Sequence, residues 1–207
     1  MPTVLKLVMR SPSEPDDGKV TTIDIYDLPG RDLADYRGLI VTMGCDQVFL
    51  HERRDELSAW VRSGGRMLVS GHPLRPFVDG MPTIRKMEFH GAGDVWLSPL
   101  GEHPIWAGVD RRDVLFNTGV PGQHSFEELT RIGVAGFYAR NYLADLPEGA
   151  IEITGIGPGK LPVDVAYPLG SGEVIVHAGN DLLGFDRPGT TAERLSQTAV
   201  SYLAGDV

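Results

Sequence analysis

Residues 64–72 read Gly-Gly-Arg-Met-Leu-Val-Ser-Gly-His and hold the strongest signal for how this chain folds. A mostly apolar run lies between glycines, as in strands that are buried on both faces of a sheet. The preceding segment Glu52–Arg62 has Leu57, Trp60 and Val61 at the i, i+3, i+4 spacing of one helix face. A helix, a Gly-Gly stop and a buried strand together predict a right-handed crossover in a parallel sheet.

Similar signals on either side extend this pattern to the whole chain. Strands are predicted at Thr3–Met9, Val20–Tyr26, Leu39–Met43, Arg66–Ser70, Lys86–His90, Val95–Ser98, Val114–Thr118, Val134–Tyr138, Ala150–Thr154, Val163–Tyr167 and Glu173–His177. Short helical segments are predicted at Arg31–Tyr36, Glu102–Gly108 and Phe126–Arg131, and a longer terminal helix at Thr190–Leu203. The turn residues 168–172 predict a hairpin between the last two strands. We therefore expect one α/β domain over residues 1–207, with a mostly parallel sheet, helices on both faces and a C-terminal hairpin.

Composition excludes several classes of protein. The 207 residues include 19 Lys and Arg against 28 Asp and Glu, a net charge of −9, which disfavours nucleic-acid binding. One cysteine, Cys45, rules out an internal disulfide and a cysteine-based zinc site. No apolar run approaches the ~20 residues that span a bilayer. We expect a soluble, cytoplasmic protein of bacterial type with no membrane partner. The sequence does not decide whether the protein forms homo-oligomers.

No metal or cofactor is expected. The six histidines do not pair at H-x-H or H-x-x-x-H spacing. Residues Gly155–Lys160 look like a phosphate loop, but they lack Ser or Thr after the lysine, and Pro158 has no amide donor. This segment is predicted to be a turn. Cys45 follows a strand, yet its neighbour Asp46 disfavours a thiolate, so a packed, non-catalytic cysteine is expected.

Two loops are the candidate site. His72 lies just past the strand Arg66–Ser70, where ligands bind in open α/β sheets, and Arg75 would donate hydrogen bonds to an anion. His72 is the candidate acid or base, because its reference pKa lies near neutrality. The alternative is an ordinary loop that Pro73 restrains.

The second loop follows the strand Glu173–His177. His177, Asn180 and Asp181 lie in quick succession there and are candidate ligand-binding residues, although Asn and Asp are also common turn formers. Both loops share one edge only if this strand, rather than its hairpin partner, runs parallel to Arg66–Ser70. The aromatic segment Tyr138–Tyr142 suits a sugar or an acidic ligand, or equally an interface.

Five short segments, which are spread over most of the length of the chain, carry a family resemblance. They are Asp35–Val41, Gly64–His72, His103–Val109, Gly172–Val176 and Gly179-Asn180. Their order resembles the class I glutamine amidotransferase-like fold, and within it the ThuA-type (trehalose-utilisation-like) branch. The resemblance implies a three-layer, flavodoxin-like arrangement.

The resemblance also bears on activity. Family members that hydrolyse glutamine carry a nucleophilic cysteine at the elbow where this chain has Gly71-His72, and their catalytic histidine would fall near His177, without its glutamate partner here. Cys45 lies one strand earlier. The ThuA-type branch often has a histidine after the elbow strand, which His72 matches. Since imidazole cannot replace the acyl-forming thiol, no glutaminase activity is expected.

The sequence leaves two functions open. The first is an amidotransferase-like domain that binds a small polar or carbohydrate-like ligand at the carboxyl ends of the strands, with or without catalysis. The second is a catalytically inert interaction or assembly protein that reuses the scaffold. An exposed apolar patch, for example at Trp96, Trp106 or Tyr138–Tyr142, would favour the second.

Overall fold

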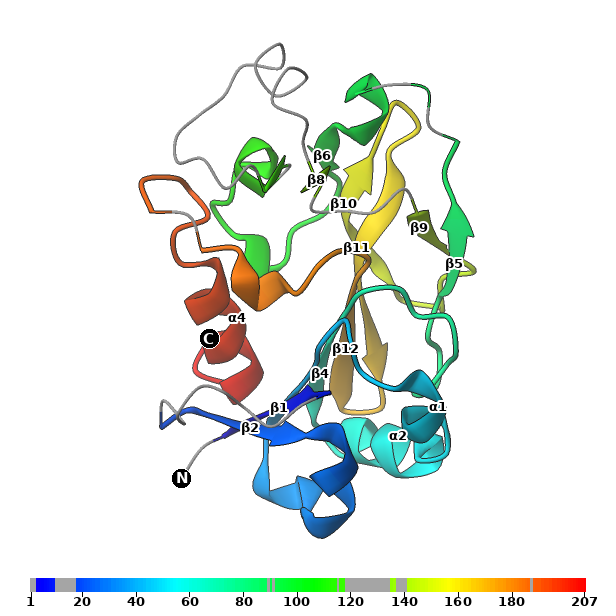
Figure 1. Ribbon diagram of the computed structural model, residues 1–207, viewed down its shortest axis with the longest axis vertical. Helices are drawn as coiled ribbons and strands as arrows, with labels where there is room; N and C mark the ends of the chain where they lie inside the picture. Colours follow the sequence, from blue (N-terminus) through cyan, green and yellow to red (C-terminus); the bar gives the residue numbers. More distant parts are fainter. Residues whose placement is uncertain are drawn as a thin grey trace.

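The computed structural model describes residues 3–9, 18–88, 90, 92–114, 116–117, 135–136, 141–186 and 188–207. Its main feature is a mixed eight-stranded sheet in the order β2-β1-β3-β4-β12-β11-β10-β6 (Figure 1). The parallel strands are β2 (Val20–Asp24), β1 (Val4–Val8), β3 (Gly38–Val41), β4 (Arg66–Ser70) and β12 (Gly172–His177). The sheet continues antiparallel through β11 (Leu161–Leu169), β10 (Ile151–Ile156) and β6 (Leu97–Pro99).

Smaller elements flank this sheet. Strand β5 (Thr83–Lys86) pairs with β9 (Asn141–Ala144), and β7 (Phe116–Asn117) pairs with β8 (Ala135–Gly136). The α-helices are α1 (Gln47–His51), α2 (Arg54–Arg62) and α4 (Leu195–Ala204). The short 3-10 helices are η1 (Ile25–Gly30), η2 (Leu33–Asp35), η3 (Ala92–Val95), η4 (Pro104–Trp106), η5 (Arg111–Val114) and η6 (Leu182–Gly184).

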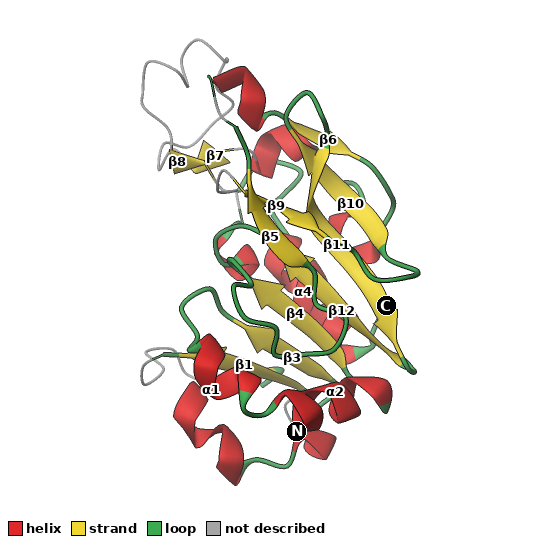
Figure 2. Cartoon of the chain, turned by 90° about the vertical axis from the view of Figure 1, so that its right-hand side faces the viewer, coloured by secondary structure: helices red, strands yellow, loops and turns green. Residues whose placement is uncertain are grey.

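Helices α2 and α4 lie on opposite sides of the parallel strands, as Figures 1 and 2 show. Helix α4 approaches β3 at Gly38, where a Cβ atom would lie 2.7 Å from Cβ of Leu203. On the other side, a Cβ at Gly172 would lie 2.1 Å from the carbonyl oxygen of Val61 at the end of α2. Both glycines are therefore needed for close packing of a helix on the sheet.

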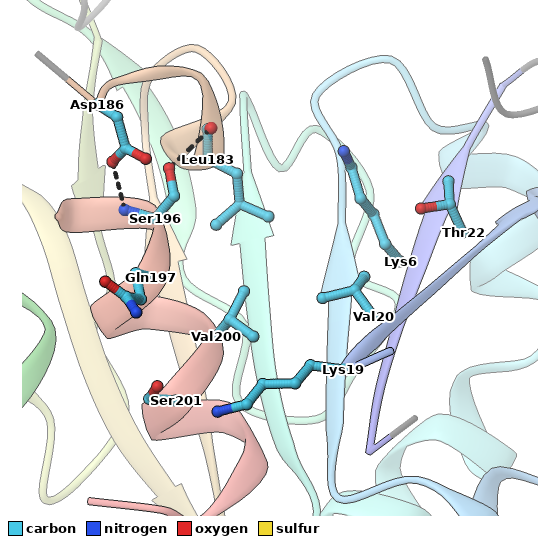
Figure 3. A pocket seen from close by; sticks show the side chains of 10 residues that line it. All are labelled: Lys6, Lys19, Val20, Thr22, Leu183, Asp186, Ser196, Gln197, Val200 and Ser201. Carbon is cyan, nitrogen blue, oxygen red and sulfur yellow. Dashed lines mark hydrogen bonds between the residues drawn. The ribbon is translucent and has the colours of Figure 1, made fainter. Parts of the chain in front are cut away.

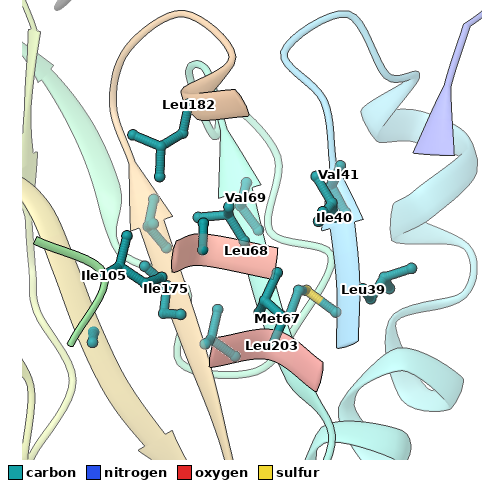
Figure 4. Packing of buried hydrophobic residues seen from close by; sticks show 14 of the residues in the cluster. Leu39, Ile40, Val41, Met67, Leu68, Val69, Ile105, Ile175, Leu182 and Leu203 are labelled. Atoms are coloured by element: carbon teal, nitrogen blue, oxygen red, sulfur yellow. The ribbon is translucent and has the colours of Figure 1, made fainter. Parts of the chain in front are cut away.

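The core fills the space between the sheet and these helices. Ile40, Leu68 and Ile175 are cross-strand neighbours on β3, β4 and β12, and all three are buried. Ile105 and Leu203 belong to the same buried cluster and lie beside them (Figure 4). Each Å² of apolar surface that is buried contributes about 25 cal/mol to the free energy of folding, so this cluster is the main source of stability.

The expected α/β class with a mostly parallel sheet is what the structure shows. The structure does not confirm the expected three-layer, flavodoxin-like arrangement. The connection from β2 to β3 holds the short helices η1 and η2, whereas a doubly wound fold has an α-helix there. Pro29 lies inside η1, and the side chains of Asp24 and Asp32 accept from backbone N–H groups two residues later, which favours short turns.

Several expected boundaries differ. The predicted helix Glu52–Arg62 corresponds to α2, which begins at Arg54, and a separate helix α1 precedes it, after its N-cap Asp46. The predicted strand Lys86–His90 is replaced by β5, and α4 begins at Leu195 rather than Thr190. Strand β9 was not predicted. The predicted helical segment Phe126–Arg131 lies outside the described residues.

Candidate functional site at the carboxyl edge of the parallel strands

The loops that follow β4 and β12 leave the sheet at the same edge. Strand β12 runs parallel to β4, with His177 opposite Ser70, while β11 is the antiparallel member of the hairpin. The backbone N–H of Gly71 donates to the carbonyl of His177 over 3.0 Å. The two candidate loops are therefore neighbours, as ligand binding at this edge requires.

The first residue after β4 has no side chain and no room for one. Gly71 has φ +97°, and a Cβ atom there would lie 2.8 Å from Cγ of Met43 in the loop after β3. A side chain would meet both backbone strain and a clash. The elbow, where the resemblance expects a nucleophile, is therefore closed to one at Gly71.

Hydrogen bonds fasten the loops to each other. The carboxylate of Asp181 accepts from the backbone N–H of Met43 over 2.6 Å, which joins the loops after β12 and β3. The side-chain amide of Gln47 donates to the carbonyl of His72 (2.7 Å) and accepts from the N–H groups of Leu74 (2.8 Å) and Arg75 (3.0 Å). Gln47 was missed in the sequence analysis, and it holds the loop after β4 against α1.

His72 is the most unusual side chain at this edge. Its ring is half-buried, and Nε2 is shielded from solvent with no hydrogen-bond partner among the described residues. Burial lowers the pKa of His72 below its ordinary value, which favours the neutral ring at pH 7. A shielded, unpartnered nitrogen is uncommon in native proteins and marks a position where a ligand or a water molecule can bind.

The other predicted site residues occupy different environments. Arg75 and Asn180 are exposed, whereas Asp181 is half-buried and engaged with Met43. His177 is fully buried at the last position of β12 rather than in the loop beyond it. Its Nδ1 lies 2.6 Å from Oδ1 of Asp164, which is also fully buried.

These two residues belong to a row of buried polar side chains across the sheet. Ser70 pairs with His177, His177 with Asp164, and Asp164 with Thr154, on β4, β12, β11 and β10 respectively. All four are buried. With strands about 4.8 Å apart, the row extends ~14 Å from the end of β4 toward the antiparallel strands.

Cys45 is in an environment that opposes nucleophilic chemistry. The side chain is buried, and the thiol donates to the carbonyl of Leu7 over 3.3 Å, with Oγ1 of Thr42 at 3.5 Å. Burial raises the pKa of the Cys45 thiol to about 11. At neutral pH the thiolate fraction is therefore very small.

The glycine-rich segment and those aromatic residues singled out in the sequence that the structure describes lie outside the candidate site. Residues 157–160 form the turn between β10 and β11, whereas Gly155 and Ile156 of the predicted turn belong to β10. Trp106 is buried, whereas Trp96 is 37% exposed. Most of the segment Tyr138–Tyr142 lies outside the described residues, and Tyr142 is half-buried in β9.

Several large apolar side chains at the carboxyl edge of the parallel strands are exposed. Five exposed examples lie in the loops after β1, β2, β3 and β4 or in α1; they are Met9, Tyr26, Met43, Val48 and Leu74. Leu74 is 78% exposed and stands two residues from His72. These five residues, the apolar rim, lie at the same edge as the candidate polar residues.

Four cavities are formed by described residues around the sheet. One of about 500 Å³ separates α4 from β1 and β2, with Lys6 and Thr22 on the strand side and Gln197 on the helix side (Figure 3). Others adjoin η4, η5 and the β10–β11 turn. None of these four is lined by the predicted site residues His72, Arg75, His177, Asn180 or Asp181.

Two negative findings apply to the described ranges. No group of three or more His, Cys, Asp or Glu side chains there is arranged to hold a metal ion. No helix within them is long and apolar enough to cross a membrane.

Comparisons with known proteins place the fold. No family model matches the chain, and no curated protein matches it significantly. The cytoplasmic protein STM3548 from Salmonella typhimurium is similar in structure, with a TM-score of 0.57 and 11% identity over 97% of this chain and 98% of that one. A cold-adapted β-galactosidase from Rahnella sp. R3 is also similar in structure, with a TM-score of 0.50 and 13% sequence identity. The match covers 98% of this chain and 31% of the β-galactosidase. At such identities, the likeness shows a shared α/β fold and nothing about activity.

Proposed function

We propose that this protein is a class I glutamine amidotransferase-like domain of the ThuA type that binds a small polar or carbohydrate-like ligand and has no glutaminase activity. The ligand would bind at the carboxyl edge of the parallel strands, beside His72. We also propose a cytoplasmic location, which the name of the similar Salmonella protein STM3548 supports.

The two positions considered for a nucleophile, Gly71 and Cys45, support the proposed lack of glutaminase activity. An acyl-enzyme route needs an activated side chain at the elbow. Gly71 has none, and the thiol of Cys45 is buried with its pKa raised to about 11. The neighbouring imidazole of His72 could move a proton but could not take over acyl transfer.

The observation that carries the ligand proposal is the shielded, unpartnered Nε2 of His72. The loop bearing it is held by three hydrogen bonds to Gln47, so the ring is presented from a restrained backbone. Such pre-organisation reduces the entropy that binding must overcome. Exposed Asn180 and Arg75 lie in the adjoining loops and would supply further polar contacts.

The test is proton and carbon NMR of histidine-labelled protein titrated with glucose, trehalose and L-glutamine. We expect at least one of them to shift the ring signals of His72, and we expect His72→Ala to abolish binding. His90→Ala is the matched control, because the His90 side chain is 80% exposed. Unchanged His72 signals with all three compounds would contradict the ligand proposal, and ammonia release that Cys45→Ala abolishes would contradict the lack of glutaminase activity.

The apolar rim favours a second function, an interaction or assembly role for the same edge. Exposed apolar side chains that gather in one place mark protein contacts more often than isolated ones do. Light scattering after size-exclusion chromatography would test self-association, with Leu74→Ser as the variant and Val207→Ser, also exposed, as the control. A monomer at all concentrations would argue against self-assembly through this rim.

A further inference from the structure

The guanidinium of Arg111 is a buried cation far from the candidate site in sequence. The residue begins η5 and is 6% exposed. Its Nε donates to Oγ1 of Thr154 over 2.8 Å, and Nη1 donates to the carbonyl of Val109 over 2.9 Å. No carboxylate oxygen in the described part of the chain lies within 4.0 Å of it. The charge of Arg111 helps to lower the pKa of Asp110, so that carboxylate lies within electrostatic range without bonding to the guanidinium. An anion that bonded directly to this buried guanidinium would form a charge-assisted hydrogen bond.

Arg111 lines two cavities. One of about 550 Å³ is bounded by η4 and the segments around it, and another of about 560 Å³ lies along β6 and η5. Sites for small molecules commonly have volumes of 300–1,000 Å³. The first has apolar walls from residues that include Pro99, Pro104 and Val109. Trp106 also lines it, and the indole N–H of Trp106 has no acceptor among the described residues.

The other polar residues of the first cavity are already engaged or are acidic. Nδ1 of His103 accepts from the N–H of Ile105 (3.3 Å), and its Nε2 faces Oε2 of Glu173 at 3.5 Å. Glu102 is exposed at the rim and would repel a multiply charged anion. Among the described residues, the donors of this cavity without an acceptor are thus Nη2 of Arg111 and the indole N–H of Trp106.

We propose that the cavity beside η4 and η5 binds a small organic molecule with one carboxylate and an apolar body. The carboxylate would bind the open edge of the Arg111 guanidinium through charge-assisted hydrogen bonds, for which a planar fork is well suited. The apolar body would lie against the proline and valine side chains. Thr154 would position the guanidinium, and a single negative charge would avoid repulsion by Glu102.

The experiment is calorimetric titration of the full-length chain with benzoate, and with benzamide as a neutral molecule of similar shape. We expect benzoate to bind at least about tenfold more tightly than benzamide, since about 1.4 kcal/mol of charge-assisted bonding corresponds to tenfold. Arg111→Met should weaken benzoate binding by about tenfold or more. Arg112→Met, which changes the exposed neighbour paired with Asp110, should alter it less than twofold.

The remaining outcomes overturn the proposal. They are undetectable benzoate binding at 10 mM (about −3 kcal/mol or weaker), equal affinity for benzoate and benzamide, or equal effects of the two arginine variants. Tighter binding of inorganic phosphate than of benzoate would overturn the assignment to a carboxylate.

If Arg111→Met does not fold, Thr154→Val retains the charge but removes the hydrogen bond that positions the guanidinium, and it should weaken benzoate binding. In the unmodified protein, benzoate should also shift the indole N–H signal of Trp106.

Discussion

Nδ1 of His177 and Oδ1 of Asp164 lie 2.6 Å apart, and both side chains are fully buried between neighbouring strands. The pair is part of the polar row that crosses the centre of the sheet. Truncation of one partner leaves a polar group in the core without its main contact. We therefore expect Asp164→Ala to lower the free energy of unfolding by about 3–5 kcal/mol, measured by urea denaturation.

An exposed pair provides the control for this prediction. Asp206 lies 2.9 Å from Lys19 with both side chains more than half exposed. Solvent and salt screen such pairs, so Asp206→Ala should change stability by about 1 kcal/mol or less. A loss at Asp164 no larger than the loss at Asp206 would show that the buried pair does not stabilise the sheet.

Cys45 should be unreactive in the folded protein. A thiol pKa raised from 9.0 to about 11 lowers the thiolate fraction at pH 8 about 100-fold, and burial slows reagent access further. We expect little modification by iodoacetamide at pH 8 and rapid modification in urea, measured by mass spectrometry. Cys45→Ala provides the blank. Rapid labelling of the folded chain would mean that the thiol is accessible.

The Gly64-Gly65 pair should be required for two different reasons. Gly64 has φ +119°, where an L side chain is strained, although nothing lies within 4 Å. At Gly65 a Cβ atom would lie 2.5 Å from the indole ring of Trp60. We expect Gly64→Ala to cost about 1 kcal/mol and Gly65→Ala about 1–3 kcal/mol in thermal or urea unfolding. Gly30→Ala, with open space around it, should be nearly neutral.

The parallel strands were predictable because burial on both faces leaves near-continuous apolar runs such as Leu39–Val41 and Met67–Val69. The first helix, α1, was missed, although Asp46 carried its signal as an N-cap. Strand β9 is short and pairs with β5 more than fifty residues away, and no local pattern records such a partner.

Part of the candidate site could also be predicted from the sequence, and part could not. The edge shared by the loops after β4 and β12 follows from topology, and the parallel orientation of β12 decides the alternative that the hairpin left open. The partner of His177 could also have been found. Leu169 pairs with Gly172 at the turn, so residues five positions out on each strand, Asp164 and His177, face each other. The burial of Arg111 could not have been found, because it depends on how irregular segments pack.

The last prediction concerns Glu173, whose carboxylate accepts from the hydroxyl of Tyr202 over 2.7 Å and faces Nε2 of His103. Burial alone would raise the pKa of Glu173, but hydrogen bonds from His103 and Tyr202 and the nearby charge of Arg66 lower it below its ordinary 4.5. A carboxyl group whose pKa is lowered in the folded state stabilises the protein at pH values above the pKa that the group has in the unfolded state. That contribution is lost as the pH falls through 4.5 toward the folded-state pKa.

We expect Glu173→Gln to be less stable than the unmodified protein at pH 7, by about 1–2 kcal/mol, with a difference that shrinks below pH 4.5 in urea unfolding. Glu148→Gln, at an exposed position, should match the unmodified protein at both pH values. A difference at Glu173 that stays constant with pH would mean that the variant acts through packing rather than through the charge.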